Sequence, residues 1–441
     1  MEHKVNQELL DFIAASPTAW HAVENLSRML TSAGCRELRE YEDWTLQPGE
    51  RVFVRRNGSA LIAFRVPEED FPGFMLMAAH ADSPCFKLKE LKTVSAAGLY
   101  AQLSVERYGG MLMAPWLDRP LSAAGRVVVR EGDRMVPRLV DLKKDLFLIP
   151  NVAIHMDRGA NENKSYDMKT DLLPLAGSVE SGKRLPALVA ESVGAREEDI
   201  VSAELQLYPR TPGTVWGLEE EYLSSPRLDD LQCAFACTQG FLRAGKGESA
   251  PVLCVFDNEE VGSGTKQGAD SDFLADTLLR LCAALGLDEA ACRRRLAQSF
   301  MVSADNAHAV HPNHPEYADK SDRPEMNKGV VVKFNAGQRY TSDAVSAAVF
   351  EEICRRAGVP TQRFTNRADL AGGSTLGNIS TSHVSIDTVD IGLAQLAMHS
   401  CYETAGTKDT AYLIRAAERF FASSLRRDGT GIRIVDGGES A

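Results

Sequence analysis

The sequence predicts an α/β protein in which helices sandwich a mostly parallel β-sheet, with a β-rich domain inserted into it. Near both ends of the chain, short apolar runs rich in branched residues alternate with amphipathic helical stretches. Between them, residues 87–217 contain strand-like pieces separated by Gly or Pro turns. The length of 441 residues also exceeds what one ordinary core accommodates. We therefore expect a discontinuous domain, residues 1–86 and 218–441, and an inserted domain, residues 87–217.

The first part of the discontinuous domain begins with two helices and continues into strands. Amphipathic patterns over residues 5–15 and 18–33 predict the helices, which Ser16-Pro17 separates. Asn57-Gly58 lies between two apolar runs and predicts a tight β-hairpin. The apolar run at residues 74–79 predicts a buried strand that ends on His80.

The inserted domain reads as a series of short strands. The strand-like pieces are KLKELKTV, GLYAQLSVERYG, GRVVVREG, RMVPRLVDL and LFLIPNVAIH. A weak helical pattern at residues 185–193 and a strand at residues 201–208 follow. The near absence of helical periodicity therefore separates this part from the rest.

After residue 217 helices and strands alternate regularly, which predicts parallel strands joined by helical crossovers. The expected helices span residues 228–244, 272–285, 289–297, 343–357 and 410–425. The expected strands span residues 252–256, 300–303, 330–335 and 389–393. The residues after 427 read as a polar tail.

Composition excludes several classes of protein. Hydrophobic residues make up 44% of the chain and charged residues 25%, as in folded soluble proteins. The net charge of -12 argues against binding to nucleic acid or to an anionic membrane. We find neither a signal peptide nor a membrane-spanning stretch. The nine cysteines are scattered without a CxxC pair, which favours reduced thiols and a cytoplasmic location.

The segment PVLCVFDNEEVGSG carries the strongest functional signal. The buried strand at residues 252–256 runs directly into Glu259 and Glu260 and then into glycines. Ligands bind at the carboxyl ends of strands in open α/β sheets. Two adjacent glutamates there would repel each other unless a cation lay nearby. Taken alone, the pair would more often be a solvated acidic loop.

Further acids and histidines follow other predicted strands or begin a helix. They are His80, Asp229 in SPRLDD, Asp305 in FMVSAD and His399 in LAQLAMHS. Each would more often be structural if considered singly, but together they match the donors that zinc, cobalt or manganese prefer. One histidine and one terminal carboxylate per ion, with one bridging carboxylate, is the pattern of a two-metal hydrolase. Asp82 lies two residues after His80, where it can receive the second imidazole N–H.

The segments HADSP, SPRLDD, DNEEVGS, SADNAHAVHPNH and LAQLAMHS resemble the signature segments of the M18 metallopeptidases, the aspartyl aminopeptidase family. The resemblance implies two Zn²⁺ per chain, with Co²⁺ or Mn²⁺ possible in one site. It implies that Asp229 bridges the two ions. The remaining ligands would be His80 and Asp305 on one ion, and Glu260 and His399 on the other.

The resemblance also implies the roles of other residues. Glu259 would be the general base, and Asp82 would orient His80. Lys333 would face an acidic side chain of the substrate, and His308 would contact the substrate. His155 of the inserted domain would reach into the active site of a neighbouring subunit. The expected partners are peptides with a free N-terminus, together with further copies of the chain.

The implied assembly is a dimer formed through the inserted domain, and dimers would build a tetrahedral dodecamer. The activity implied is removal of N-terminal Asp or Glu by attack of a metal-activated water. A related zinc aminopeptidase with neutral specificity, or a zinc deacylase, is an alternative. A catalytically dead assembly protein is a second alternative, although every predicted ligand and the base are present. Lys333 could also simply extend its ammonium to solvent.

Overall fold

The computed structural model describes residues 2–68, 70–162, 164–370 and 372–437. The chain forms two compact units. The first consists of Met1–Asp82, Gly213–Met398 and Glu403–Ala441, and the second of Ser83–Pro212 and His399–Tyr402. No described helix combines the length and the apolar character needed to cross a lipid bilayer.

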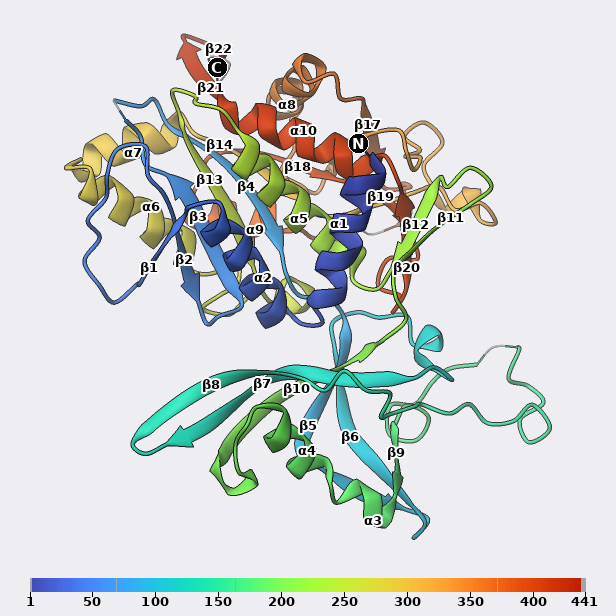
Figure 1. Cartoon of the computed structure of the whole chain (residues 1–441). Helices are drawn as coiled ribbons and strands as arrows, with labels where there is room; N and C mark the ends of the chain where they lie inside the picture. The colour runs from blue at the N-terminus through green and yellow to red at the C-terminus, as the bar shows by residue number, and fades with distance from the viewer. Residues whose placement is uncertain (1, 69, 163, 371, 438–441) are drawn as a thin grey trace. The chain divides into compact units, whose positions relative to one another are not determined.

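A nine-stranded mixed sheet forms the centre of the first unit (Figure 1). In spatial order its strands are β1 (Arg36–Leu38), β2 (Arg51–Arg56), β3 (Ala60–Arg65), β13 (Ala250–Phe256), β4 (Phe74–His80), β14 (Phe300–Ala304), β18 (Asp387–Gly392), β16 (Val330–Phe334) and β17 (Thr361–Thr365). Five of its eight pairings are parallel, and β2–β3, β3–β13 and β16–β18 are antiparallel. The predicted α/β fold is thus confirmed.

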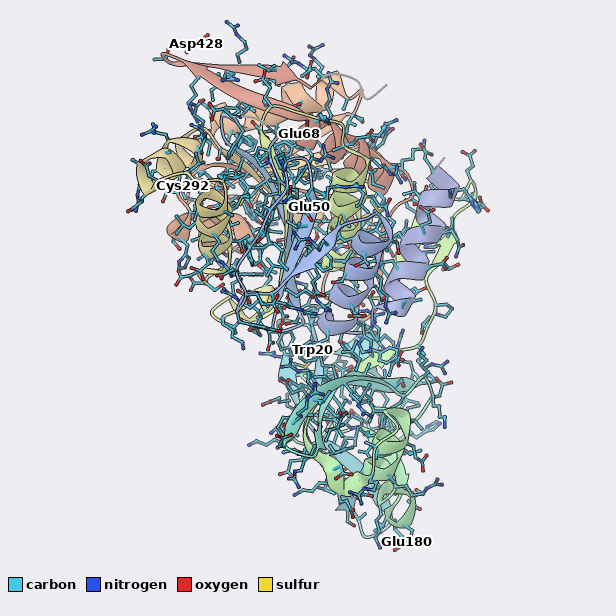
Figure 2. The ribbon with its side chains drawn as sticks, turned by 60° about the vertical axis from the view of Figure 1, so that its left-hand side comes forward. Trp20, Glu50, Glu68, Glu180, Cys292 and Asp428 are labelled. Atoms are coloured by element: carbon cyan, nitrogen blue, oxygen red, sulfur yellow. The ribbon has the colours of Figure 1, made fainter. Side chains whose placement is uncertain are left out.

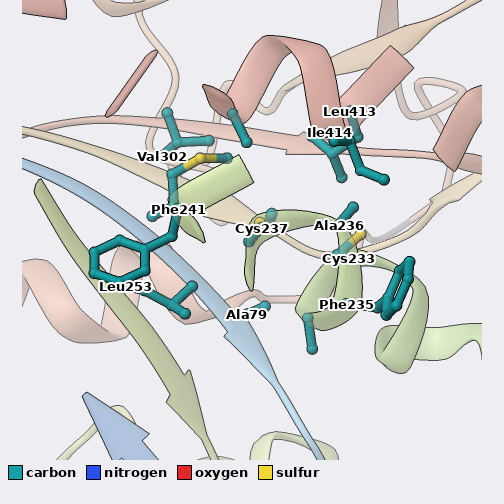
Figure 3. Packing of buried hydrophobic residues seen from close by; sticks show 14 of the residues in the cluster. Ala79, Cys233, Phe235, Ala236, Cys237, Phe241, Leu253, Val302, Leu413 and Ile414 are labelled. Carbon is teal, nitrogen blue, oxygen red and sulfur yellow. The ribbon is translucent and has the colours of Figure 1, made fainter. Parts of the chain in front are cut away.

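Helices cover both faces of this sheet. Successive residues of its central strands point to opposite faces and are apolar, so each face needs a covering layer. In β13, Leu253 and Val255 join one core while Val252 and Cys254 join the other. The first core is covered by α1 (Glu2–Ala15), α2 (Ala19–Ser32), α5 (Leu228–Arg243), α8 (Ala344–Arg356) and α10 (Asp409–Ala422). The second is covered by α6 (Phe273–Ala284), α7 (Glu289–Ala297) and α9 (Leu376–His383). Figure 3 shows Phe241 of α5 beside Leu253 in the first core.

A smaller sheet in the first unit supports the start of α5. Its order is β11 (Thr214–Trp216), β12 (Tyr222–Ser225), β20 (Glu403–Gly406), β19 (Ala394–Leu396) and β15 (Ala307–His308). Strand β12 leads directly into the Pro226 turn before α5. This sheet therefore places Glu403 and the acidic start of α5 close together.

The hairpin at Asn57-Gly58 is formed, whereas the expected polar tail is not. Asn57 and Gly58 have φ values of 56° and 69°, which a type I′ turn requires of both central residues. After α10 the chain forms the hairpin β21 (Ser423–Asp428) and β22 (Gly431–Asp436). The helix expected over residues 410–425 therefore ends earlier, at Ala422. Ile432 and Ile434 of the expected tail pack against the first core, and the charged residues around them hid this alternation in the sequence.

The second unit contains a six-stranded antiparallel sheet. Its strands in order are β8 (Arg134–Asp141), β7 (Leu121–Glu131), β10 (Ile200–Pro209), β5 (Cys85–Ala96), β6 (Tyr100–Tyr108) and β9 (Leu175–Ser178). Helices α3 (Val179–Gly182) and α4 (Leu185–Ser192) pack on it. Glu180 of α3, which Figure 2 labels, forms an exposed ion pair with Lys183.

The prediction of a strand in LFLIPNVAIH is wrong. This segment makes only isolated bridges, at Phe147, Leu148 and Ile149. Pro150 follows at once, and a proline has no backbone N–H to extend a strand ladder.

Candidate metal centre

The acidic cluster of the first unit lies where three parallel strands end together. Strands β13, β4 and β14 are neighbours, and Phe256 of β13 pairs in register with His80 of β4. His80 is the last residue of β4, and Asp305 comes directly after β14. The 3₁₀ turn at Glu259–Val261 follows β13 after two residues. The shared edge therefore brings together side chains from distant parts of the chain.

The start of α5 contributes two aspartates from a locally non-helical backbone. Asp229 has φ −80° and ψ 108°, outside the helical region. Its N–H donates to the Glu403 carboxylate at 3.0 Å. The neighbouring Asp230 carboxylate accepts the backbone N–H of His80 at 3.1 Å. Both aspartates are thereby held against the end of β4.

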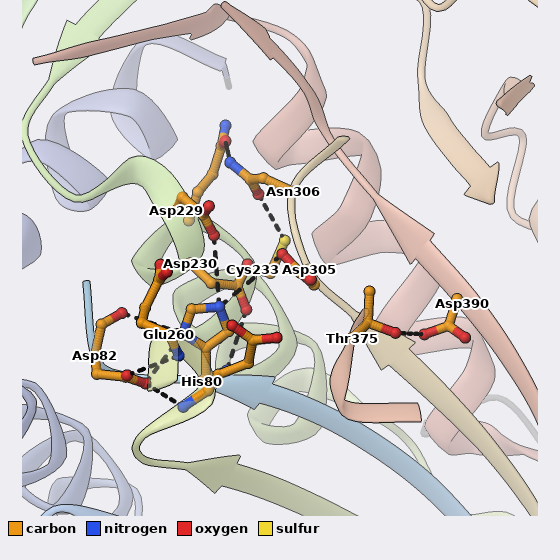
Figure 4. A network of polar contacts seen from close by, with 12 residues as sticks. His80, Asp82, Asp229, Asp230, Cys233, Glu260, Asp305, Asn306, Thr375 and Asp390 are labelled. Carbon is orange, nitrogen blue, oxygen red and sulfur yellow. Dashed lines mark hydrogen bonds and ion pairs between the residues drawn. The ribbon is translucent and has the colours of Figure 1, made fainter. Parts of the chain in front are cut away.

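The His80 imidazole lies among three carboxylates (Figure 4). Its Nε2 is 3.5 Å from Asp229 Oδ1 and 4.0 Å from Asp305 Oδ1. Its Nδ1 is 3.3 Å from Asp82 Oδ1 and 3.1 Å from the Asp82 carbonyl oxygen. His80 and Asp82 are buried, so these contacts are shielded from water.

Two overlapping groups of side chains have the donor set and the compactness of a cation site. One group is His80, Asp229 and Glu260, and the other is Asp229, Asp230 and Asp305. Within each group the potential ligand atoms lie within 4.8 Å of one another. One imidazole with several carboxylates suits zinc. The residues therefore fit the metal that the sequence predicts, and Asp229 belongs to both groups.

The electrostatics of the cluster also favour a cation. The pKa of the Glu259 carboxyl is raised to about 8, mainly by burial; His80 opposes this rise, and the charges of Asp305, Asp82 and Asp229 add to it. Burial and Asp229 likewise raise the pKa of Glu260 well above its usual range. Burial alone would lower the pKa of His80, but its hydrogen bonds with Asp229 and Asp82 raise it well above the usual value. A bound divalent cation would relieve this repulsion among buried carboxylates.

Asp82 connects His80 with the acidic doublet. Its Oδ1 accepts the backbone N–H of Glu259 at 3.1 Å, and its Oδ2 accepts that of Glu260 at 3.2 Å. The same carboxylate lies beside His80 Nδ1. One buried side chain thus orients the end of β4 and the turn after β13.

Lys333 and His308 of the first unit stand in different surroundings. Lys333 is 2% exposed, and its ammonium lies 3.6 Å from Asp305 Oδ2. His308 is exposed on β15, with its ring centroid 5.9 Å from that of Phe364. Lys333 is therefore an internal partner of the cluster and does not extend to solvent.

The two remaining histidines of the predicted site belong to the second unit. His399 has φ 66°, and its carbonyl oxygen accepts the N–H of Leu112 at 3.0 Å. His155 is exposed in the long connection between β8 and β9. The roles expected of both residues stay predictions.

Sequence reasoning missed several polar residues that support the cluster. Asp230 is fully buried, and the acidic doublet in SPRLDD was the signal that could have identified it. Asn306 donates to Gln232 and Gln395 at 3.1 and 2.9 Å and accepts from the Cys233 thiol. No local pattern marks such contacts, because their partners are more than seventy residues apart.

Comparison with known proteins identifies the family. Residues 12–421 match the family described as aminopeptidase I zinc metalloprotease (M18). The probable M18 family aminopeptidase 2 of Clostridium acetobutylicum is 43% identical over 423 residues, covering 94% of this chain and 98% of the relative. The protein of the same description from Pseudomonas aeruginosa is 40% identical over 435 residues, covering 96% of this chain and 99% of the relative.

Solved structures show the same fold. A chain in the cryo-EM structure of the Ape4 and Nbr1 complex has a TM-score of 0.91 at 37% identity, covering 95% of this chain and 86% of that one. The S. cerevisiae mApe1 dodecamer gives a TM-score of 0.83 at 28% identity, covering 95% and 96%. With these matches over nearly its whole length, the chain belongs to the M18 family of metallo-aminopeptidases, as its motifs predicted.

Proposed function

We propose that the protein is a co-catalytic zinc aminopeptidase that removes N-terminal Asp or Glu from peptides. The observation that carries the proposal is that two compact groups of potential ligand side chains share Asp229. A shared carboxylate between two compact donor groups is what a two-metal hydrolase requires.

The proposed ligand sets follow the sequence motifs, and they divide the donors differently from the two compact groups, in which His80 lies with Glu260 and Asp305 with Asp230. Asp229 would bridge the ions, with His80 and Asp305 on one and Glu260 and His399 on the other. Two zinc ions held there would supply Lewis acidity toward the scissile carbonyl and the attacking water. The distances of 3.5 and 4.0 Å from His80 Nε2 to Asp229 Oδ1 and Asp305 Oδ1 support the first set, because these three donor atoms are close enough together to hold one ion.

Glu259 is the proposed general base. Its carboxylate would take a proton from the attacking water and return it to the leaving amine. Burial and, against the effect of His80, the surrounding carboxylates raise its pKa to about 8, and a pKa shifted in this way is typical of catalytic carboxyl groups. Asp82 would hold Glu259 in place through its backbone N–H and keep Nδ1 of His80 oriented.

Substrate recognition would use both the acidic and the basic residues. Carboxylates of the cluster would hold the free α-amino group of the peptide, which limits cleavage to the first residue. Lys333 would attract an acidic side chain, and exposed His308 would contact the substrate. Because Lys333 already contacts Asp305, neutral specificity remains the second candidate.

We further propose that the second unit, with predicted bounds 87–217, mediates dimerisation and that dimers build a dodecamer. One structural relative is a dodecamer. Support within this chain comes from exposed apolar side chains on both sides of His155, namely Val152, Ile154 and Met156, which are 48%, 47% and 83% exposed. Such side chains favour burial against a partner.

The nine buried free cysteines support a cytoplasmic location.

The direct test combines metal analysis with substrate comparison. We expect two zinc ions per chain and faster hydrolysis of Asp- and Glu-anilides than of Leu-anilide. A preference for Leu-anilide would favour the neutral-specificity alternative. Absence of hydrolysis of all three by zinc-loaded protein would contradict the proposal as a whole.

A further inference from the structure

The ammonium of Lys333 is surrounded by acceptors from a single segment. Its Nζ donates to the Asp305 carbonyl oxygen at 2.9 Å and lies 3.4 Å from the Asn306 carbonyl oxygen. Asp305 Oδ2 is 3.6 Å away, and the Tyr340 ring centroid is 5.2 Å away. Lys333 therefore contacts both the backbone and the carboxylate of Asp305.

These contacts complete the attachment of a segment that leaves the sheet. The N–H of Asp305 donates to Ile391 at 3.1 Å, and the N–H of Ala307 donates to Leu393 at 2.8 Å. Backbone hydrogen bonds thus hold the N–H groups of Asp305 and Ala307. Lys333 contacts the carbonyl groups of Asp305 and Asn306, which lie between them. A buried ammonium that loses such partners is strongly destabilised, and so are the carbonyl groups left without a donor.

We propose that Lys333 is a positioning residue that fixes Asp305 for metal binding, in addition to any contact with a substrate side chain. The inference rests on the proposed function, in which Asp305 is a zinc ligand. Replacement of a residue that orients a metal ligand typically lowers metal affinity by roughly 10–100-fold. A residue that only recognised acidic substrates would leave metal affinity unchanged.

The two roles predict different behaviour of Lys333→Met, which removes the charge and all three donors at similar side-chain length. If Lys333 positions Asp305, half of the zinc should be lost at a chelator concentration about tenfold lower than in the wild type. The kcat for Leu-anilide should fall together with that for Asp-anilide, because both reactions use the same metal centre. The control is Lys328→Met, the same replacement at an exposed lysine five residues away.

The measurement is zinc content after dialysis against graded concentrations of a chelator, together with kcat and KM for both anilides. Wild-type zinc retention in Lys333→Met, with only the KM for Asp-anilide raised, would overturn the inference. Lys333→Gln serves the same comparison if the Met variant does not fold, as judged by circular dichroism. A wild-type protein that bound no zinc would instead refute the proposed function, so the two failures are distinguishable.

Discussion

The carboxylate of Asp82 accepts the backbone N–H of Glu259 at 3.1 Å. It also accepts the N–H of Glu260 and lies 3.3 Å from Nδ1 of His80. Asp82 was predicted only to orient His80. It therefore also fixes the backbone position of Glu259, the proposed base, and of Glu260, a proposed metal ligand. The histidine and the acidic doublet are mechanically connected through one buried side chain.

Replacing Asp82 with Asn should weaken both connections. The amide of Asn has one acceptor oxygen and cannot accept the N–H groups of both Glu259 and Glu260 as the carboxylate does. We therefore expect a loss of roughly 10–100-fold in zinc affinity or in kcat/KM. Chelator competition and anilide kinetics measure the two effects. Asp270→Asn, at an acid whose carboxylate lies 2.8 Å from Nε2 of exposed His383, is the matched control. Equal behaviour of the two variants would show that Asp82 has no orienting role.

Glu259→Gln should separate metal binding from proton transfer. We expect zinc content to stay at the wild-type value while kcat falls by roughly a thousandfold or more, a barrier increase of about 4 kcal/mol. Metal analysis and anilide hydrolysis check both parts. Glu260→Gln is the matched comparison in the same turn, and it should lose zinc instead. Zinc loss in Glu259→Gln with retention in Glu260→Gln would reverse the two assignments.

His155 should act in a neighbouring subunit. His155→Ala alone and Glu259→Gln alone should both be impaired, but co-assembled chains should regain activity. Random pairing makes about half of the dimers mixed, each with one complete site, so about a quarter of wild-type activity should return. Co-expression with two affinity tags followed by anilide assays provides the measurement. Mixed dimers no more active than the parent variants would place His155 outside the partner's site.

Asp409 should make stability depend on pH. Burial raises its pKa from 3.8 to about 7, although the backbone N–H groups of Asn327 and Gly329 oppose this. Between about pH 4 and pH 7 the folded state therefore keeps a proton on Asp409 that the unfolded state has lost. The contribution of this protonated carboxyl to stability is complete below about pH 4 and is lost as pH rises through 7.

The measurement for Asp409 is the free energy of unfolding of the wild type and of Asp409→Asn across that range. The wild type should lose stability relative to the variant as pH rises from about 4 to 7. Taking the difference removes the contribution of all other titrating groups. A difference that stays constant over the range would contradict the expected titration.

The sequence alone determined many of the helices and buried strands of the first unit and the residue types of the site. The Asn57-Gly58 hairpin and the buried strand before Glu259 were predictable because turn preference and apolar periodicity are properties of neighbouring residues. The motifs likewise identified the family before any comparison.

Only the tertiary structure decided which side chains meet. It placed Asp230 beside the backbone of His80, and it bound Lys333 to the carbonyl group of Asp305. It also showed that the segment after Ser423 forms a hairpin against the core. Such contacts join residues far apart in the chain, and burial makes them favourable only once the whole sheet has formed, so no local pattern specifies them.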